Sequence, residues 1–212
     1  MRRILIAFSL LSAFLLAGST AWAQSSGNSV FEMQKSQCAI DSSNGTLTGG
    51  TSNPGLLFSD TIQTPNTGQA ALLITPSLVT GLYTDNKITN NSSSSTQDIG
   101  VDVTVLVDGN AVEPETTASG SGSYVIYDQR FIQVSSTVIS SLASCTTGVT
   151  CFQLVESTLS AHSFNFVYPD PGQGEHTVTV NWNILNGGNG EAACVGPATI
   201  TVEQVQNYKQ DQ

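Results

Sequence analysis

Two histidines, His162 and His176, are the side chains of this 212-residue chain with the clearest potential for chemistry. They lie on consecutive predicted strands on either side of a turn at 169–174, so they could face each other and bind a metal ion with Asp170 or Glu175. Each histidine also begins an alternating apolar face, where an imidazole packs and satisfies its nitrogens locally. We favour the packing role, and a metal site is the alternative.

A second group of candidates is a set of carboxylates on one predicted hairpin, whose turn is Asp108-Gly109-Asn110. Calcium takes several oxygen ligands that converge from loops, so Asp108 and its neighbours are a candidate calcium site. The EF-hand spacing is absent, and alternating acidic residues are typical of a solvated strand face. The five carboxylates are Asp98, Asp102, Asp108, Glu113 and Glu115.

Asp128 and Arg130 stand two positions apart on a predicted strand and therefore share a face. Arg130 is the one arginine beyond residue 23. A partly buried ion pair, with Asp128 or with a cross-strand carboxylate, is the favoured interpretation. A clamp for the carboxylate of a ligand is the alternative.

Motifs that identify common enzymes are missing from the sequence. It contains no GxSxG elbow, HExxH pair, Walker loop or dinucleotide fingerprint, so we expect no catalytic residue and no cofactor other than the calcium considered above. A glycosidase needs only two carboxylates about 5–10 Å apart, so an extracellular carbohydrate-active enzyme stays open. Sugar clefts are usually rich in exposed aromatic rings, whereas Trp182 alternates with valines of a predicted core strand.

The first 23 residues have the pattern of a cleaved export signal. Arg2 and Arg3 precede an apolar run at 4–18, and Ala21 and Ala23 occupy the two positions that a signal peptidase reads. A serine stands where a lipid-bearing cysteine would be needed, and no second apolar segment follows. The sequence therefore predicts a secreted or periplasmic protein without a lipid anchor and without membrane insertion after cleavage.

All four cysteines follow the signal, and an even number in an exported chain indicates disulfides. Cys145 and Cys151 enclose a short segment in which Gly148 can make a tight turn, so we pair them. Cys38 then pairs with Cys194 and fastens the N-terminal segment to the last hairpin.

Charge excludes some partners. Beyond residue 23 only four lysines and arginines accompany 16 acidic residues, which gives a net charge of −12. This charge repels phosphate backbones and anionic lipid, so nucleic acid is excluded as a partner. An unknown protein or a glycan remains as the ligand.

The mature region is rich in Thr, Ser, Val, Asn and Gly, which favours strands joined by polar turns. Apolar residues alternate over 101–107 and 176–184, Pro76 splits two short strands, and 135–144 is the one plausible helix. We expect a flexible segment at 24–36, one domain at 37–206 and a polar tail at 207–212. About eight to ten strands without a βαβ rhythm predict an all-β antiparallel sandwich.

The closing pattern resembles that of exported bacterial jelly-roll proteins. It consists of a strand at 174–182, a glycine-rich turn and a strand at 198–203, with 127–130 and 161–164 adding to the likeness. The resemblance implies a jelly-roll-like sandwich and no particular activity. The sequence thus favours an exported, non-enzymatic binding or structural module of the cell surface or periplasm, with an extracellular carbohydrate-active enzyme or a calcium-stabilised adhesion module as alternatives.

Overall fold

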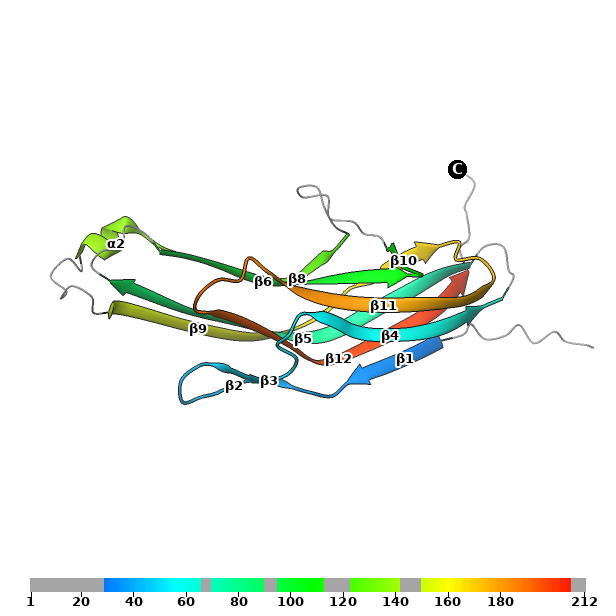
Figure 1. Ribbon diagram of the computed structural model, residues 1–212, viewed down its shortest axis with the longest axis horizontal. Helices are drawn as coiled ribbons and strands as arrows, with labels where there is room; N and C mark the ends of the chain where they lie inside the picture. The colour runs from blue at the N-terminus through cyan, green and yellow to red at the C-terminus, as the bar shows by residue number, and fades with distance from the viewer. Residues whose placement is uncertain (1–28, 66–69, 90–94, 113–122, 142–149, 207–212) are drawn as a thin grey trace, which may run out of the picture.

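The computed structural model describes residues 29–65, 70–89, 95–112, 123–141 and 150–206, and these form an elongated antiparallel β-sandwich (Figure 1). The first sheet has the order β1-β12-β5-β10, and β9 also pairs with β5. The second has the order β4-β11-β6-β7, and β8 also pairs with β6. The predicted all-β sandwich is therefore confirmed.

The elements of the first sheet are β1 (Ser29–Gln34), β5 (Ala70–Thr89), β9 (Thr150–Ser163), β10 (Phe166–Pro169) and β12 (Glu191–Gln206). Those of the second are β4 (Gly55–Thr64), β6 (Ser95–Val107), β7 (Asn110–Ala111), β8 (Val125–Val134) and β11 (Gly174–Leu185). A small ribbon of β2 (Cys38–Ile40) and β3 (Leu47–Gly49) and one short helix, α2 (Ser136–Ser141), complete the described elements.

Strand pairing is nested along the chain. β1 pairs with β12, β4 with β11, β5 with β9 and β6 with β8, as in one long hairpin ribbon folded around its middle. The ribbon then closes on itself because β12 also pairs with β5 and β11 also pairs with β6. This wrapping of a ribbon into two sheets gives the sandwich its jelly-roll-like order.

The core lies between the sheets and follows the alternation read from the sequence. Val101, Val103, Val105, Val107 and Trp182 are all fully buried. Because side chains on a strand alternate between faces, one apolar face on each sheet suffices to fill this layer.

The hairpin turn at Asp108-Gly109 is also confirmed. Val107 pairs with Asn110, and the φ angles of Asp108 and Gly109 are 51° and 80°. Positive φ at both central residues is the conformation that matches the twist of a two-residue hairpin.

Two local predictions need correction. Residues 29–34 of the segment expected to be flexible form β1, because the pairing with β12 supplies partners for its backbone. Pro76 does not split β5, since it stays paired with Ile200 while the strand on the other side changes from β10 to β9.

Cys38 and Cys194 form the predicted disulfide, which joins β2 to β12. The predicted bridge between Cys145 and Cys151 and the export signal at 1–23 lie outside the residues whose side chains are described. Within the described part of the chain, no helix has the length and apolar character needed to cross a membrane.

Candidate functional site

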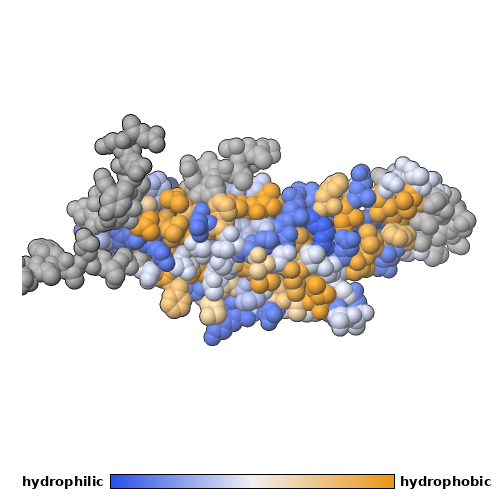
Figure 2. Space-filling model, turned by 180° about the vertical axis from the view of Figure 1, so that it is seen from behind, coloured by the Kyte–Doolittle hydropathy of each residue, from blue (hydrophilic) through white to orange (hydrophobic). Residues whose placement is uncertain are grey.

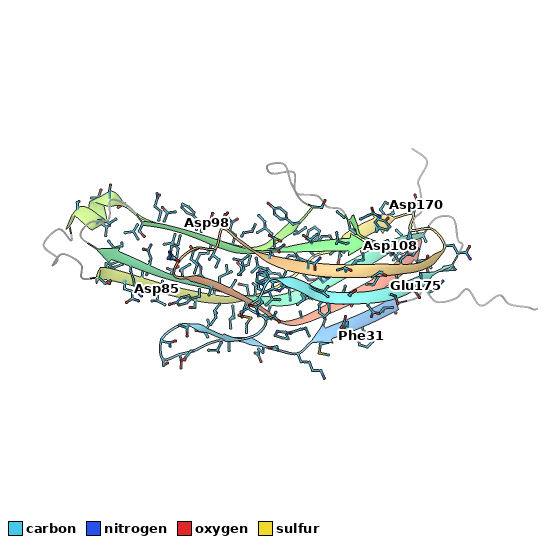
Figure 3. The ribbon with its side chains drawn as sticks, in the orientation of Figure 1. Phe31, Asp85, Asp98, Asp108, Asp170 and Glu175 are labelled. Carbon is cyan, nitrogen blue, oxygen red and sulfur yellow. A yellow bond between two sulfur atoms is a disulfide. The ribbon has the colours of Figure 1, made fainter. Side chains whose placement is uncertain are left out.

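A polar cleft of about 580 Å³ lies where the sheets meet the β11–β12 turn. Its walls are residues 85–87 of β5, residues 95–98 of β6, and residues 186 and 188–191 of the turn. Asp85 and Asp98, which belong to opposite sheets, are labelled at this end of the molecule (Figure 3). We call this site the polar cleft.

The β11–β12 turn is held against β5 by a close backbone approach. The backbone N–H of Asp85 donates to the carbonyl of Gly190 at 2.7 Å. Gly190 has a φ of 79°, and a Cβ atom there would lie 2.7 Å from the Asp85 carbonyl oxygen. Only glycine therefore fits at this point of the cleft wall.

Asp85 is paired on both carboxylate oxygens. Oδ2 lies 2.8 Å from Lys87 Nζ, and Oδ1 accepts from Gln153 Nε2 at 2.7 Å. Burial acts to raise the pKa of Asp85, but the hydrogen bonds from Lys87 and Gln153 hold that pKa below its usual value. Asp85 is thus ionised, and the positive charge of Lys87 balances its negative charge in the cleft wall.

The other two carboxylates of the polar cleft are also occupied. Asp98 accepts from the side-chain amides of Gln129 and Asn186, both at 2.9 Å. Glu191 accepts the backbone N–H of Asp98 at 2.9 Å with one oxygen and that of Gly188 with the other. These carboxylates hold the turn on the sheets.

Two amide side chains in the same walls are not fully paired. Asn86 is 1% exposed and Gln97 is 8% exposed. Asn86 accepts from Ser95, and Gln97 Nε2 donates to the Asp85 carbonyl at 3.1 Å. Asn86 Nδ2 and Gln97 Oε1 have no partner in the described structure. The walls of the polar cleft therefore contain one buried donor and one buried acceptor that have no partner among the described residues.

His176 belongs to a different network at the opposite end of the sandwich. Its Nδ1 lies 2.7 Å from Asp108 Oδ2, and its Nε2 lies 3.1 Å from Thr64 Oγ1. The order hydroxyl, imidazole, carboxylate is that of a hydrolase triad, but Thr64 is 1% exposed and donates to the Gly172 carbonyl. The network therefore joins three strand ends and does not present a nucleophile.

His162 lies in the other sheet from His176, so the structure does not bring the two histidines together. His162 pairs with Leu78 in β5, and its Nε2 is 3.7 Å from Asp128 Oδ2. Asp128 instead accepts from Thr80 Oγ1 at 2.8 Å. This contact crosses between the sheets, because Asp128 is on β8 and Thr80 is on β5.

Arg130 does not pair with Asp128. It donates to the carbonyl of Glu156 at 2.9 Å and to the hydroxyl of Thr158, both on β9. Among the described residues no carboxylate forms an ion pair with Arg130. The expected ion pair is therefore replaced by a hydrogen-bonded tie between β8 and β9.

The hairpin carboxylates are spread over separate environments. Asp98 lines the polar cleft, Asp108 contacts His176, and Asp102 is 4% exposed beside Asn183. Glu113 and Glu115 lie outside the described residues. Over the described ranges, no three His, Cys, Asp or Glu side chains are grouped so as to hold a metal ion.

A second hollow, of about 520 Å³, is apolar and crosses β1, β5, β9 and β12. Met33 and Pro197 line it, and Phe31, which is 79% exposed, lies on the same strand as Met33. Figure 2 shows apolar side chains on the visible face in separate patches with hydrophilic residues between them. No single broad docking face is evident in that view.

Sequence reasoning missed the polar cleft. Its amides come from β5 and β6, and the position of the β11–β12 turn against them follows from strand pairing that periodicity does not reveal. One feature of the sequence could have indicated it. Thr84, Asn86 and Gln97 are polar, although the alternation along their strands predicts inward-facing apolar residues at these positions.

No protein-family model matches this chain, and no curated protein matches it either. Among solved structures, dimeric latent PorU from Porphyromonas gingivalis matches over 89% of this chain with 10% sequence identity and a TM-score of 0.25. This chain spans 14% of the length of that PorU chain. The resemblance to exported jelly-roll proteins stays a prediction.

Proposed function

We propose that this protein is an exported, non-enzymatic binding module that takes its ligand in the polar cleft. The observation that carries the proposal is the contrast within one cleft, where the carboxylates are paired but one atom of each of the Asn86 and Gln97 amides has no partner among the described residues. An unpaired buried amide atom costs about 1–3 kcal/mol, so such groups favour a partner from outside the chain. The cleft volume also lies in the usual range of ligand sites.

The same pairing argues against general acid–base catalysis in the polar cleft. Such catalysis needs a carboxyl group with a raised pKa beside one that stays ionised. Among the described carboxylates, burial raises the pKa of Asp102, and Asp102 is not among the residues that line the polar cleft. A binding role therefore has more support than the carbohydrate-active enzyme considered from the sequence.

Export to an oxidising compartment is part of the proposal. The disulfide between Cys38 and Cys194 fits a secreted or periplasmic location, where such bonds persist. The signal pattern at 1–23 supports the same location.

The test is a binding screen on glycan and peptide arrays with three proteins. Thr96 is an exposed residue of the polar cleft, so Thr96→Trp should block the cleft at little cost in folding. Thr61→Trp places the same ring on exposed β4 and serves as the control. We expect wild type and T61W to bind the same probe and T96W to lose it. Equal binding by T96W, or cleavage of the bound probe, would overturn the proposal.

A further inference from the structure

The polar cleft is lined entirely by polar side chains and glycines. None of the described residues that border it is aromatic or aliphatic. A peptide or lipid ligand needs apolar pockets for its side chains or acyl groups. Because each bordering residue has a polar side chain or is a glycine, the cleft favours a ligand that forms many hydrogen bonds.

The charges of the polar cleft exclude an anionic ligand. Asp85, Asp98 and Glu191 face only one cation, Lys87, which is already paired with Asp85. The chain as a whole is strongly acidic, so a phosphate, sulfate or uronate group would be repelled from this site.

The unused groups match a hydroxyl in type. Asn86 Nδ2 is a donor and Gln97 Oε1 is an acceptor, and one hydroxyl can accept from the first and donate to the second. Thr84 Oγ1, on the same face of β5 as Asn86, is a third buried atom without a partner. Each paired carboxylate oxygen also keeps a lone pair that a further hydroxyl can use.

We propose that the ligand of the polar cleft is an uncharged oligosaccharide, with one hydroxyl bound between the amides of Asn86 and Gln97. This inference rests on the proposed function, since it names the ligand class of that same site. Hydrogen bonds supply the specificity, and the cleft offers no ring for stacking. Affinity therefore depends strongly on each amide.

The experiment uses the full mature protein on an array that carries neutral oligosaccharides, acidic oligosaccharides and peptides. The strongest neutral probe is then titrated by calorimetry against wild type, Gln97→Ala and Gln133→Ala. Gln133 is an exposed residue of β8 opposite Thr96 and is the matched control. We expect binding to neutral glycans, a Kd raised at least about fivefold by Q97A because one hydrogen bond is lost, and no change with Q133A.

A second variant acts on the unused donor. Asn86→Asp keeps the oxygen that accepts from Ser95 and replaces the amide nitrogen with an oxygen, which makes the group a carboxylate that is ionised at neutral pH. Because Asn86 is 1% exposed, this charge costs stability, so N86D should unfold at a lower urea concentration than wild type. Below that concentration the variant is folded and should no longer bind the glycan.

Other outcomes separate this inference from the proposed function. Preference for acidic oligosaccharides, or neutral binding that Q97A leaves unchanged, overturns the inference. Peptide binding that T96W abolishes, without any glycan binding, also overturns it but leaves the binding function standing. Binding of no array probe contradicts both.

Discussion

The backbone N–H of Asp98 donates to Glu191 Oε1 at 2.9 Å, although the two residues are 93 positions apart. The second oxygen of Glu191 accepts from the N–H of Gly188. One side chain thus fixes its own turn and also ties that turn to β6. The wall of the polar cleft depends on this carboxylate, so its removal should be felt in both stability and binding.

Replacing Glu191 with alanine should destabilise the protein by about 1–3 kcal/mol, because two backbone donors lose their acceptor. Urea unfolding monitored by Trp182 fluorescence measures the difference. Glu203→Ala is the control, since Glu203 is exposed on the same strand. Equal stability of the two variants would show that Glu191 does not anchor the turn.

Asp108→Asn tests the link between the hairpin turn and His176. The hydrogen bonds from His176 and from the Thr177 N–H hold the pKa of Asp108 below its usual value. The ionised form therefore adds stability above the unfolded-state pKa of about 4, and this stability is lost as pH falls through the folded pKa. D108N should be less stable than wild type at pH 7. The difference should be modest, because the Asp108 side chain is 43% exposed and water screens its interactions. The difference in stability between the two proteins should disappear below pH 4. A gap that is constant with pH would contradict this assignment.

Asp102→Asn should change the stability at pH 7 in the opposite direction to D108N. Burial raises the pKa of Asp102, so ionising it in the folded protein costs stability as pH rises above the unfolded-state value. Asparagine stays neutral and can still accept from Asn183 Nδ2, which donates to Asp102 Oδ1 at 3.0 Å. D102N should therefore be more stable than wild type at pH 7 and equal to it near pH 3. Chemical unfolding at the two pH values measures both, and a loss of stability at pH 7 would sink the prediction.

Periodicity predicted the parts of the fold that depend on one strand at a time. The valines of β6 and Trp182 of β11 alternate with polar residues, and their burial follows from the two-residue repeat of a strand. The turn at Asp108-Gly109 follows from the conformational preferences of those two residues. Each of these properties is local and is therefore readable from sequence.

Properties that depend on pairing could not be predicted in this way. Pro76 looks like a break, but β5 passes it because two different strands share its other edge. His162 and His176 are 14 positions apart and lie in opposite sheets because the nested ribbon separates neighbours in the sequence. The polar cleft arises from the same wrapping, since its walls come from β5, β6 and the β11–β12 turn, which no single periodicity connects.

Calcium should leave stability unchanged. The described carboxylates of the former candidate site are engaged in three separate hydrogen-bonded groups, which a shared cation would have to disrupt. We expect the same melting temperature with millimolar calcium and with excess chelator, measured by calorimetry. A clear drop in chelator would instead support the calcium-stabilised adhesion module.

The observed disulfide and the predicted one should contribute unequally to stability. The bond between Cys38 and Cys194 spans 156 positions, and the chain-entropy model then gives about 5 kcal/mol of stabilisation. The predicted bridge between Cys145 and Cys151 would close a loop of only about seven residues and contribute about 2 kcal/mol on the same model. Serine replacements of each pair, compared by urea unfolding, should therefore differ by roughly 3 kcal/mol.

Non-reducing peptide mapping checks the pairing itself, and a link from Cys38 to Cys151 would contradict it. If the two replacements lowered the free energy of unfolding equally, loop length would not explain the stabilisation by the Cys38–Cys194 bond. That bond would then stabilise the protein by holding β2 against β12.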